Sequence, residues 1–490
     1  MIVSHLIWVK APVTRPDYVA AMSAAMPRID PELLRRYDRP GPRYTSYPTA
    51  PQFDENFGET QLREAAAASN GDPIPRRLSL YLHIPYCTSP CFYCGCNRTI
   101  TRDKARAESY LVRLYREIAM MPALFDRDRD VIQCHFGGGT PNFLSPAQLG
   151  EVMNSLQRNF HFSDSNARDV SIELDPRFVT PDEVAELTAI GFNRASLGVQ
   201  DFDSDVQAAV NRIQDVDETL AIIDACRDSG MRSINVDLIY GLPKQSPEGF
   251  ARTLDIVTRA RPDRLAVYGY AHMPHLFKAQ RQIESADLPS AEVKLGLLQL
   301  AIEKLDAAGY VYIGMDHFAL PDDDLARAQA NGSLHRNFMG YTTHADSDLI
   351  GLGVSAISHI GDTFSQNPRD LVAWQAAIDE GRLPVFRGMR MDEDDCLRAD
   401  LIQALMCQGE IPIAALERRY AMNFEEYFAD SLARLAPLVA DGLVTLAHGR
   451  VAATTQGRLL LRNIAMCFDR YLDTGGAGQQ STAPRYSHAI

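Results

Sequence analysis

Four cysteines crowd into one short loop, and their spacing indicates metal chemistry. Cys87, Cys91, Cys94 and Cys96 occur in the segment HIPYCTSPCFYCGC, and the first three have the pattern C-x3-C-x2-C. A loop of this length can wrap one iron–sulfur cubane and give a thiolate to each of three irons, whereas ordinary four-iron clusters have four cysteine ligands. The pattern therefore predicts a cluster with one iron open to another ligand, which is typical of a reactive metal site.

Other uses of these cysteines fit the sequence less well. A zinc knuckle needs two separated pairs of Cys or His, and no second pair lies nearby. The chain has 9 cysteines, of which five are scattered singly, and this odd, irregular set does not predict a disulfide framework. Buried thiols without a function do not suit a loop rich in Pro, Ser, Gly and Asn. Free cysteines in this number indicate a reducing, cytoplasmic compartment.

A run of three glycines, Gly137–Gly139, follows a second apolar stretch in the segment HFGGGTP. Because glycine has no Cβ atom, this backbone could approach a charged ligand closely. The alternative is a tight turn between a strand and a helix that requires positive φ angles. Three glycines in succession at the end of a strand favour a ligand loop.

These loops need elements that bring them together. From about residue 78, short apolar runs alternate with amphipathic stretches. Six βα units in succession predict a parallel sheet, either open and doubly wound or curved into a partial or full barrel. In both folds the chemistry belongs at the carboxyl ends of the strands, where the polar and Gly-rich segments occur. The expected strands are 78–84, 131–136, 170–174, 194–199, 233–239 and 265–270, with 311–315 as a candidate seventh.

Amphipathic helices are expected between the strands, among them 104–121 and 295–305. Three connections begin with Ser or Thr followed by Pro, at 145–146, 180–181 and 246–247. The hydroxyl can cap a helix, and Pro suits the first helical position. Gln148 and Glu183 complete a capping box in the first two connections.

The chain becomes helical after about residue 381. Helices are expected at 395–406, 413–420 and 425–440, before a hairpin of 443–446 and 450–453. Three helices and a hairpin resemble a winged-helix arrangement, and a lid or packing domain is the alternative. The expected division is a disordered leader (1–30), an N-terminal extension that closes the active site (31–76), the sheet domain with its extension (77–380), a helical, winged-helix-like C-terminal domain (381–475) and a flexible tail (476–490).

Composition limits the partners of the chain. Its 490 residues carry a net charge of −14, and 46% hydrophobic with 23% charged residues is ordinary for a globular protein with a sizeable core. An acidic chain without a basic stripe does not predict nucleic-acid binding, although a pocket can still gather arginines around a small anion. No apolar run is long enough to predict a membrane span. The start lacks the charged region and cleavage site of a signal peptide.

With the C-x3-C-x2-C pattern, the chain resembles the radical S-adenosylmethionine superfamily, for which this pattern is the signature. The resemblance implies an α/β fold, a partial (β/α)6-type barrel, and a [4Fe-4S] cluster held by Cys87, Cys91 and Cys94. The amino and carboxylate groups of S-adenosylmethionine would chelate the fourth iron. One electron would then cleave the sulfonium to give a 5′-deoxyadenosyl radical.

Further segments narrow the resemblance to the oxygen-independent coproporphyrinogen III oxidases (dehydrogenases). They are RYTSYPT (43–49), HFGGGTP (135–141), GMDHF (314–318), LHRNF (334–338), GYTT (340–343) and GLGVSAIS (351–358). The match extends from about residue 30 to residue 475. Cys96 resembles a cysteine that is important in these enzymes without binding the cluster. The related haem chaperones have an aromatic residue in its place.

The resemblance also implies contacts to S-adenosylmethionine, of which the family binds two molecules. The implied contacts are Tyr81, Tyr93, Gly138, Gly139, Thr140, Glu173, Gln200, Arg212, Asp237, Ala271 and Ile357. Arg212 suits the methionine carboxylate, because a guanidinium donates two parallel hydrogen bonds. A helix cap or a salt bridge is the alternative for Glu173, and plain core packing is the alternative for Ala271 and Ile357.

Four more residues of interest occur in the shared segments. Arg43 and Arg336 suit substrate propionates, which are planar carboxylates, and an ion pair within the fold is the alternative for each. His83 and His317 are lone histidines, which are more often structural than catalytic.

The resemblance implies a radical enzyme of haem biosynthesis that converts coproporphyrinogen III to protoporphyrinogen IX without O2. Two propionates would each lose CO2 and become vinyl groups. The implied partners are the porphyrinogen and a one-electron donor such as flavodoxin or ferredoxin, with no nucleic acid and a monomeric chain. The alternatives are a haem-binding chaperone on the same scaffold and a winged-helix regulator that uses the cluster as a redox sensor.

Overall fold

The structure is a computed structural model, and it describes residues 31–447 and 449–472. The leader and the tail predicted from the sequence lie outside these residues. The chain divides into two compact units, and neither is continuous in sequence. We call Pro51–Pro289 with His344–Met391 the sheet unit, and Met1–Ala50, Ser290–Thr343 and Asp392–Ile490 the helical unit. The domains predicted above are contiguous segments, so they divide the chain differently.

Six parallel strands form the central part of the sheet unit, as the sequence predicts. They are β1 (Arg77–Ile84), β4 (Asp130–Gly138), β6 (Asp169–Leu174), β7 (Arg194–Gln200), β8 (Ser233–Tyr240) and β9 (Arg264–Gly269). Each strand pairs in parallel with the next one along the chain. Because the order never reverses, right-handed crossovers place every connecting helix on the same face of the sheet. This order selects the partial (β/α)6 barrel over the doubly wound sheet.

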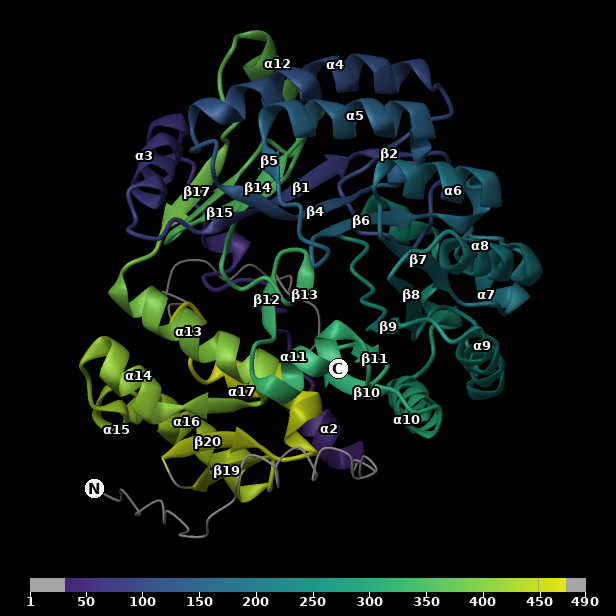
Figure 1. Ribbon diagram of the computed structural model, residues 1–490. Helices are drawn as coiled ribbons and strands as arrows, with labels where there is room; N and C mark the ends of the chain where they lie inside the picture. The colour runs from purple at the N-terminus through teal and green to yellow at the C-terminus, as the bar shows by residue number, and fades with distance from the viewer. Residues whose placement is uncertain (1–30, 448, 473–490) are drawn as a thin grey trace. The chain divides into compact units, whose positions relative to one another are not determined.

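The connecting helices follow one face of this sheet (Figure 1). They are α4 (Ala105–Met120), α5 (Pro146–Asn159), α6 (Pro181–Ile190), α7 (Ser204–Ala209), α8 (Val216–Asp228) and α9 (Pro247–Ala260). Ser145, Thr180 and Ser246 each accept a hydrogen bond from a backbone N–H of the first helical turn, as predicted. The apolar faces of α4, α5 and α9 bury Leu, Val and Ile side chains against the strands.

The sheet continues beyond β1 through a strand that the sequence analysis did not predict. β14 (Ser347–Leu352) pairs in parallel with β1, and antiparallel β15 (Ile357–Ile360), β16 (Thr363–Gln366) and β17 (Arg387–Arg390) follow. A Cβ at Gly351 would lie 2.5 Å from the Ile357 carbonyl oxygen, so only glycine permits this return of the chain. The remaining elements are α3 (Glu59–Asn70), β2 (Tyr86–Cys87), β3 (Thr99–Ile100), β5 (His161–Phe162) and α12 (Leu371–Asp379).

The helical unit takes its first elements from two distant stretches of the chain. These are α2 (Pro31–Tyr37), α10 (Ala291–Ala307), β10 (Val311–Gly314), β11 (His317–Ala319), α11 (Asp324–Asn331), β12 (His335–Asn337) and β13 (Gly340–Thr342). The candidate seventh strand at 311–315 is confirmed as β10, which lies in the same sheet but pairs antiparallel with β11. Gly314 and Met315, with φ angles of 153° and 51°, turn the chain back at this point.

The C-terminal segment completes the helical unit. It contains α13 (Glu393–Gln408), α14 (Ile413–Tyr420), α15 (Phe424–Tyr427), α16 (Ala429–Ala440), α17 (Leu461–Met466) and a sheet of β18 (Glu410–Pro412), β20 (Arg450–Ala453) and β19 (Val444–Ala447). The single helix predicted at 425–440 was wrong, because the chain breaks at Phe428. The break turns the buried Phe428 ring toward Phe424 and Phe468, with centroids 4.9 Å and 5.7 Å away.

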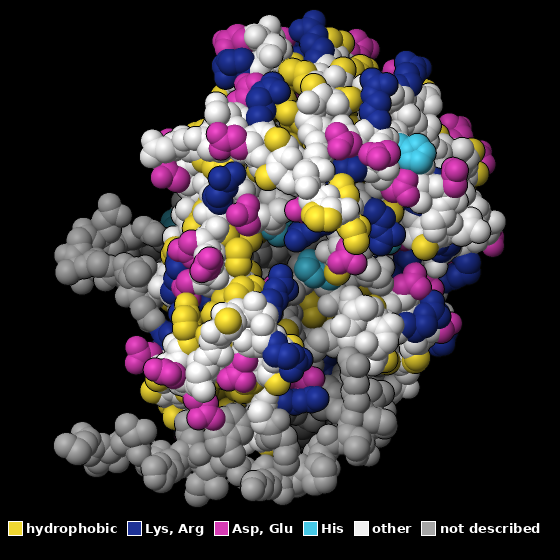
Figure 2. Space-filling model, turned by 60° about the vertical axis from the view of Figure 1, so that its left-hand side comes forward, with side chains coloured by type: hydrophobic (Ala, Val, Ile, Leu, Met, Phe, Trp, Pro, Cys, Tyr) yellow, Lys and Arg dark blue, Asp and Glu magenta, His cyan; other side chains and the backbone are white. Residues whose placement is uncertain are grey.

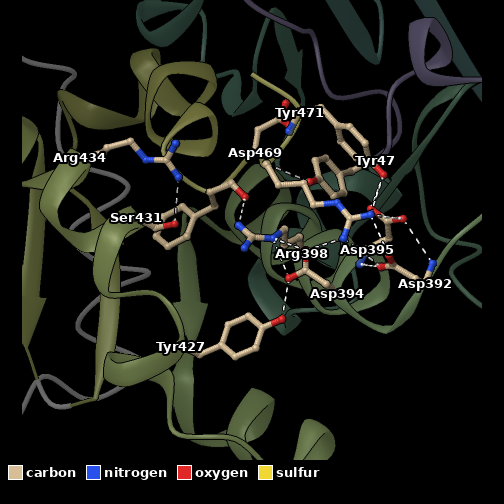
Figure 3. Close-up of polar contacts among 12 residues, drawn as sticks. Tyr47, Asp392, Asp394, Asp395, Arg398, Tyr427, Ser431, Arg434, Asp469 and Tyr471 are labelled. Carbon is tan, nitrogen blue, oxygen red and sulfur yellow. Dashed lines mark hydrogen bonds and ion pairs between the residues drawn. The ribbon is translucent and has the colours of Figure 1, made fainter. Parts of the chain in front are cut away.

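An acidic cluster at the start of α13 joins distant parts of the helical unit (Figure 3). Arg470 donates to Asp392 and Asp394, at 2.8 Å each, and the Tyr471 hydroxyl donates to Asp395 at 2.8 Å. The Tyr47 hydroxyl accepts the Arg470 N–H at 3.2 Å. This network ties the segment near residue 47 to the last described residues of the chain.

Candidate active site

The cysteine loop leaves the carboxyl end of β1. Cys87 lies on β2, which pairs in parallel with β3, so the two ends of the loop lie side by side. His83 fixes the same loop, because its Nε2 atom lies 2.9 Å from the Asn97 carbonyl oxygen and its Nδ1 atom lies 3.0 Å from the Tyr81 hydroxyl. Both ring nitrogens of His83 therefore have structural partners. These two contacts give His83 a role in holding the loop.

The thiols differ in exposure and in protonation. Cys87 and Cys91 are buried, Cys94 is partly buried and Cys96 is exposed. Contact with Cys96 lowers the pKa of Cys94 to about 6, while burial raises the pKa of Cys87 to about 11. Since only the thiolate is a metal ligand, binding of a cluster would be accompanied by loss of the thiol protons.

Hydrogen-bond donors surround the loop. Thr140 Oγ1 lies 3.3 Å from Cys87 Sγ, and Arg212 Nη1 lies 3.4 Å from Cys91 Sγ. Arg98 donates to the carbonyl oxygens of Cys91 and Cys94 at 3.2 Å and 3.1 Å. Two guanidinium groups and a hydroxyl therefore support negative charge on the sulfur atoms, as an anionic cluster requires.

These donors and thiols fit an iron–sulfur cluster better than a single ion. No group of three or more His, Cys, Asp or Glu side chains in residues 31–447 and 449–472 converges on one metal ion. A cubane spreads its thiolates over separate irons, so its ligands need not converge on a point. Cys96 is set apart from the other three by its exposure, and its N–H donates to Cys94 Sγ at 3.4 Å.

The glycine loop lies directly beside the first cysteine. Gly138 has a φ angle of 117°, which side-chain residues rarely adopt. A Cβ at Gly139 would lie 2.9 Å from the Tyr86 carbonyl oxygen and 3.1 Å from Cys87 Sγ. The sequence left open a ligand loop and a tight turn between a strand and a helix. Both describe the same geometry, because the tight turn also brings backbone without side chains next to the cysteine loop.

Glu173 forms the next part of the site, on β6. Its carboxylate accepts a hydrogen bond from His135 at 3.2 Å and from the Gly138 N–H at 3.3 Å. Burial would raise the pKa of Glu173, but His135 and the Gly138 N–H outweigh it and hold the pKa below its usual value. The Tyr81 ring stacks on His135 with centroids 6.0 Å apart. Glu173 is therefore ionised beside the glycine loop and ready to accept from a donor on a ligand.

Arg212 and Gln200 present buried polar atoms that fit a small polar ligand. The Nη1 atom of Arg212 donates to Asp175 Oδ2 at 3.1 Å, and its Nη2 atom donates to the Gly198 carbonyl oxygen. Its Nε atom is buried without a hydrogen-bond partner, and so is Oε1 of Gln200. Buried polar atoms are normally satisfied, so these two indicate an absent polar molecule. A methionine carboxylate for Arg212 and an amino or hydroxyl donor for Gln200 meet that need.

Asp237 lies on β8, and Ala271 lies just after the end of β9. Asp237 accepts from Asn235 Nδ2 at 2.8 Å and from Ser196 Oγ at 3.2 Å, and burial raises the pKa of Asp237 to about 6. The carbonyl oxygen of Ala271 accepts from Gln280 Nε2 at 3.1 Å, and the same Nε2 atom donates to the Tyr93 carbonyl oxygen at 2.9 Å. Gln280 thereby connects the segment after β9 to the cysteine loop.

Ile357 lies at the start of β15, with its backbone against Gly351. Gly351 lies on β14 and is the cross-strand partner of Tyr81 on β1. One strand, β14, therefore separates Ile357 on β15 from β1, which leads into the cysteine loop. All the residues implied as cofactor contacts thus belong to the sheet unit. Most of them lie at strand ends or in the loops that follow, where a parallel sheet gathers its chemistry, whereas Tyr81 and Asp237 lie within β1 and β8.

The sequence analysis missed several residues that support the site. They are Arg98, His135, Asp175, Asn235 and Gln280. Asp175 follows a predicted strand in a polar turn, and that position is the signal that could have found it. Gln280 carries no such signal, because its role depends on two carbonyl groups far apart in the sequence.

Arg43, His317 and Arg336 belong to the helical unit. Arg43 forms an ion pair with Asp316. The His317 ring lies edge-on to Tyr341, with centroids 5.3 Å apart. Arg336 lies over the same Tyr341 ring, 4.7 Å from its centroid. The structure therefore gives Arg43 the ion pair that was its alternative interpretation, while Arg336 forms no ion pair with any of the described residues.

Comparisons with known proteins decide the family. Residues 81–257 match the Radical SAM superfamily and residues 391–460 match the HemN C-terminal domain. The chain is 51% identical over 445 residues to the oxygen-independent coproporphyrinogen III oxidase of Pseudomonas aeruginosa, covering 91% of this chain and 96% of that protein. It is 48% identical to the Escherichia coli protein of the same name, over 92% of this chain and 97% of that one. The chain belongs to the oxygen-independent coproporphyrinogen III oxidase family.

A solved structure agrees with this assignment. The coproporphyrinogen III oxidase of Escherichia coli, described as a radical SAM enzyme, has a TM-score of 0.86 and 47% identity, and it covers 91% of this chain and 100% of that chain. The predicted fold and family are therefore confirmed. As a radical SAM protein of the oxygen-independent coproporphyrinogen III oxidase family, the chain uses a [4Fe-4S] cluster and S-adenosylmethionine, which the three thiols and the unsatisfied atoms at Arg212 and Gln200 fit.

Proposed function

We propose that this chain converts coproporphyrinogen III to protoporphyrinogen IX without O2, by oxidative decarboxylation of two propionate side chains to vinyl groups. The observation that carries the proposal is the juxtaposition of Cys91 with Arg212, which presents a buried, unsatisfied Nε atom beside a cluster-binding thiol. A site for a small zwitterionic cofactor beside a metal cluster is what radical chemistry of this kind requires. The names of the relatives supply the substrate.

Each residue of the site has a part in this proposal. Cys87, Cys91 and Cys94 hold the cluster. When bound, the cluster and S-adenosylmethionine supply a carbon radical that can take a hydrogen atom from the β-carbon of a propionate. Arg212 binds the methionine carboxylate, and Asp175 holds the guanidinium in place at 3.1 Å. Transfer of that hydrogen atom to the carbon radical, release of the carboxyl carbon as CO2 and transfer of one electron to a one-electron acceptor leave a vinyl group.

The remaining contacts orient the cofactor. Glu173 is ionised and accepts from an amino or hydroxyl group, and Gln200 Oε1 accepts a further hydrogen bond. The ligand can approach the backbone closely at Gly138, Gly139 and Thr140. The aromatic faces for the adenine come from Tyr81 and Tyr93. Asp237, Ala271 and Ile357 complete the contacts. Cys96 acts in turnover without binding iron.

The proposal includes further features of the family resemblance. Two molecules of S-adenosylmethionine bind, a small one-electron carrier such as flavodoxin or ferredoxin reduces the cluster, and the chain acts as a cytoplasmic monomer. In the described part of the chain, no helix combines the length and apolar composition needed to cross a membrane.

The alternatives receive less support. Figure 2 shows acidic and basic side chains interspersed over one face of the molecule, which is unlike the basic stripe of a DNA-binding regulator. A haem chaperone is disfavoured by Cys96 and by the relatives, which are named as oxidases. An anaerobic assay separates these functions: the enzyme forms protoporphyrinogen IX and 5′-deoxyadenosine, whereas haem binding with neither product would identify a chaperone.

The ligand assignment is tested by alanine variants. We expect Cys87→Ala, Cys91→Ala and Cys94→Ala each to lose the cluster and all activity, because three thiolates anchor it. Cys96→Ala should keep its iron and lose most of its turnover. Iron and sulfide content, measured after anaerobic reconstitution, distinguishes the two groups.

Cys226, a buried cysteine on α8, provides the matched control, and Cys226→Ala should retain full iron content. Full cluster retention in any of the first three variants, or iron loss in Cys96→Ala, would show that the ligands are assigned wrongly.

A further inference from the structure

The guanidinium group of Arg336 is buried in the helical unit without an acceptor. The residue lies on β12 and is 5% exposed. Its Nε and Nη1 atoms are enclosed and have no hydrogen-bond partner. Within residues 31–447 and 449–472, no carboxylate and no carbonyl oxygen accepts from this group. A buried cation that has lost its water and gained no anion is costly, so its presence calls for an explanation.

The other buried arginines of the described residues do not share this property. Each donates to a protein oxygen: Arg129 to Asp348 at 2.6 Å, Arg194 to Asp169 at 2.6 Å, Arg212 to Asp175 at 3.1 Å, Arg458 to the Ile313 carbonyl at 3.4 Å and Arg462 to the Pro42 carbonyl at 3.0 Å. Each of these five guanidinium groups therefore has at least one oxygen acceptor, although the Nε atoms of Arg212 and Arg458 have none. Arg336 is the exception among the buried arginines of the described residues.

The surrounding contacts hold this group in a fixed position. Arg336 stands directly opposite Tyr341 in the β12–β13 hairpin, and its guanidinium carbon lies 4.7 Å from the ring centroid. The Tyr341 hydroxyl donates to the Met406 carbonyl oxygen at 3.0 Å, and Gln403 Nε2 donates to the Arg336 carbonyl oxygen at 3.1 Å. The ring face offsets part of the cost of burial, but it accepts no hydrogen bond from the N–H groups at the edge.

One carboxylate that acts on Tyr341 is already engaged. The negative charge of Asp316 affects the Tyr341 hydroxyl, yet Asp316 forms its ion pair with Arg43. Arg43 and Arg336 were equal candidates for a substrate propionate on sequence grounds. The structure separates them, because Arg43 holds an internal carboxylate and Arg336 holds none.

We propose that Arg336 binds a carboxylate of the substrate, which is one of the propionates of coproporphyrinogen III. The identity of that carboxylate rests on the proposed function. The planar fork of a guanidinium matches the two oxygens of a carboxylate, and the ring of Tyr341 holds the fork ready before the ligand arrives. Arg336 is thus a substrate-binding residue of the helical unit.

The experiment measures binding without turnover. Reconstituted enzyme, kept anaerobic and without reductant or S-adenosylmethionine, is titrated with coproporphyrin III and with its tetramethyl ester, and fluorescence gives both dissociation constants. Arg336→Gln should weaken binding of the acid at least about tenfold and leave binding of the ester unchanged. Arg336→Lys keeps the positive charge but not the planar fork of the guanidinium. Its affinity for the acid should lie between that of the wild type and that of Arg336→Gln.

Arg43→Gln is the matched control, and its affinity for the acid should stay within about twofold of the wild type. Acid affinity that is unchanged in Arg336→Gln, or acid and ester affinities that fall together in both Arg336 variants, would overturn the proposal. Failure of the proposed function looks different: the wild-type enzyme itself would bind no coproporphyrin and form no protoporphyrinogen IX.

Discussion

At the scale of single residues, hydrogen bonds to the cysteine sulfurs matter most. Thr140 is one of the groups that supports a cluster ligand, with Oγ1 3.3 Å from Cys87 Sγ. A donor to a thiolate stabilises the reduced, more negative cluster more than the oxidised one, and therefore raises the reduction potential. Thr140→Val keeps the shape of the side chain and removes only this donor.

We expect Thr140→Val to lower the reduction potential by about 20–60 mV, the equivalent of one lost hydrogen bond. Anaerobic titration followed by electron paramagnetic resonance gives the value. Thr88 adjoins Cys87 and, among the described residues, makes no hydrogen bond to a sulfur. Thr88→Val is therefore the control, and its reduction potential should equal that of the wild type. Equal potentials in the two variants would contradict this role of Thr140.

The residue scale is also where the sequence was most informative about the site. The cysteine pattern and the glycine run are local features, so Cys87 and Gly139 could be proposed from the residues alone, whereas Arg212 was proposed only through the family resemblance. Asp175 and Gln280 could not be proposed, because their roles depend on partners that are distant in sequence. The difference between Arg43 and Arg336 is of the same kind, since only the structure shows which guanidinium already has an anion.

At the scale of elements, one buried carboxylate connects helix α4 to the segments of the sheet unit that follow β14. Glu117 accepts from the Gly353 N–H at 2.8 Å, from Asn367 Nδ2 at 2.8 Å and from Trp374 Nε1 at 3.2 Å. Burial raises the pKa of Glu117 to about 7 against the opposing effect of these donors. The folded protein therefore keeps a proton that the unfolded chain releases at lower pH.

Because the pKa of Glu117 is higher in the folded state, this residue stabilises the fold at low pH and ceases to do so as pH rises to about 7. Between pH 7.5 and pH 5.5, we expect the unfolding free energy of the wild type to increase by about 2 kcal/mol relative to Glu117→Gln. The other titrating groups are common to both proteins and cancel. Urea unfolding of both proteins at the two pH values measures the difference between their unfolding free energies. A difference that is the same at both pH values would refute the raised pKa of Glu117.

The elements themselves were predicted well where the signal is local. Alternating apolar runs and Ser/Thr-Pro caps gave the six parallel strands and the starts of α5, α6 and α9. β14 was missed, because its residues read as a glycine-rich motif and its strand character comes from pairing with β1. The break at Phe428 was missed as well, since helical periodicity does not reveal that one aromatic ring is needed in the core.

At the scale of the whole molecule, the helical unit is built from segments that are far apart in the chain. Tyr37, Tyr44 and Tyr47 are buried in the same core as α13, α16 and α17. The Tyr44 hydroxyl donates to Asp469 at 2.9 Å, and Arg462 donates to the Pro42 carbonyl oxygen at 3.0 Å. A reading of the sequence in order could not predict this, because periodicity within each segment does not say which segments share a core.

This shared core predicts that a change near the start of the chain weakens its end. Tyr44→Ala removes a large ring from the core and the hydrogen bond to Asp469, and we expect it to destabilise the helical unit by about 3–5 kcal/mol. Hydrogen exchange measured by mass spectrometry should show faster exchange in α13, α16 and α17, although none of their residues is altered. Protection of β1 to β9 should not change.

Tyr115→Ala on α4 is the matched control, and it should leave α13, α16 and α17 as protected as in the wild type. Unchanged protection of α17 in Tyr44→Ala would mean that the N-terminal segment only covers a helical unit that is stable by itself.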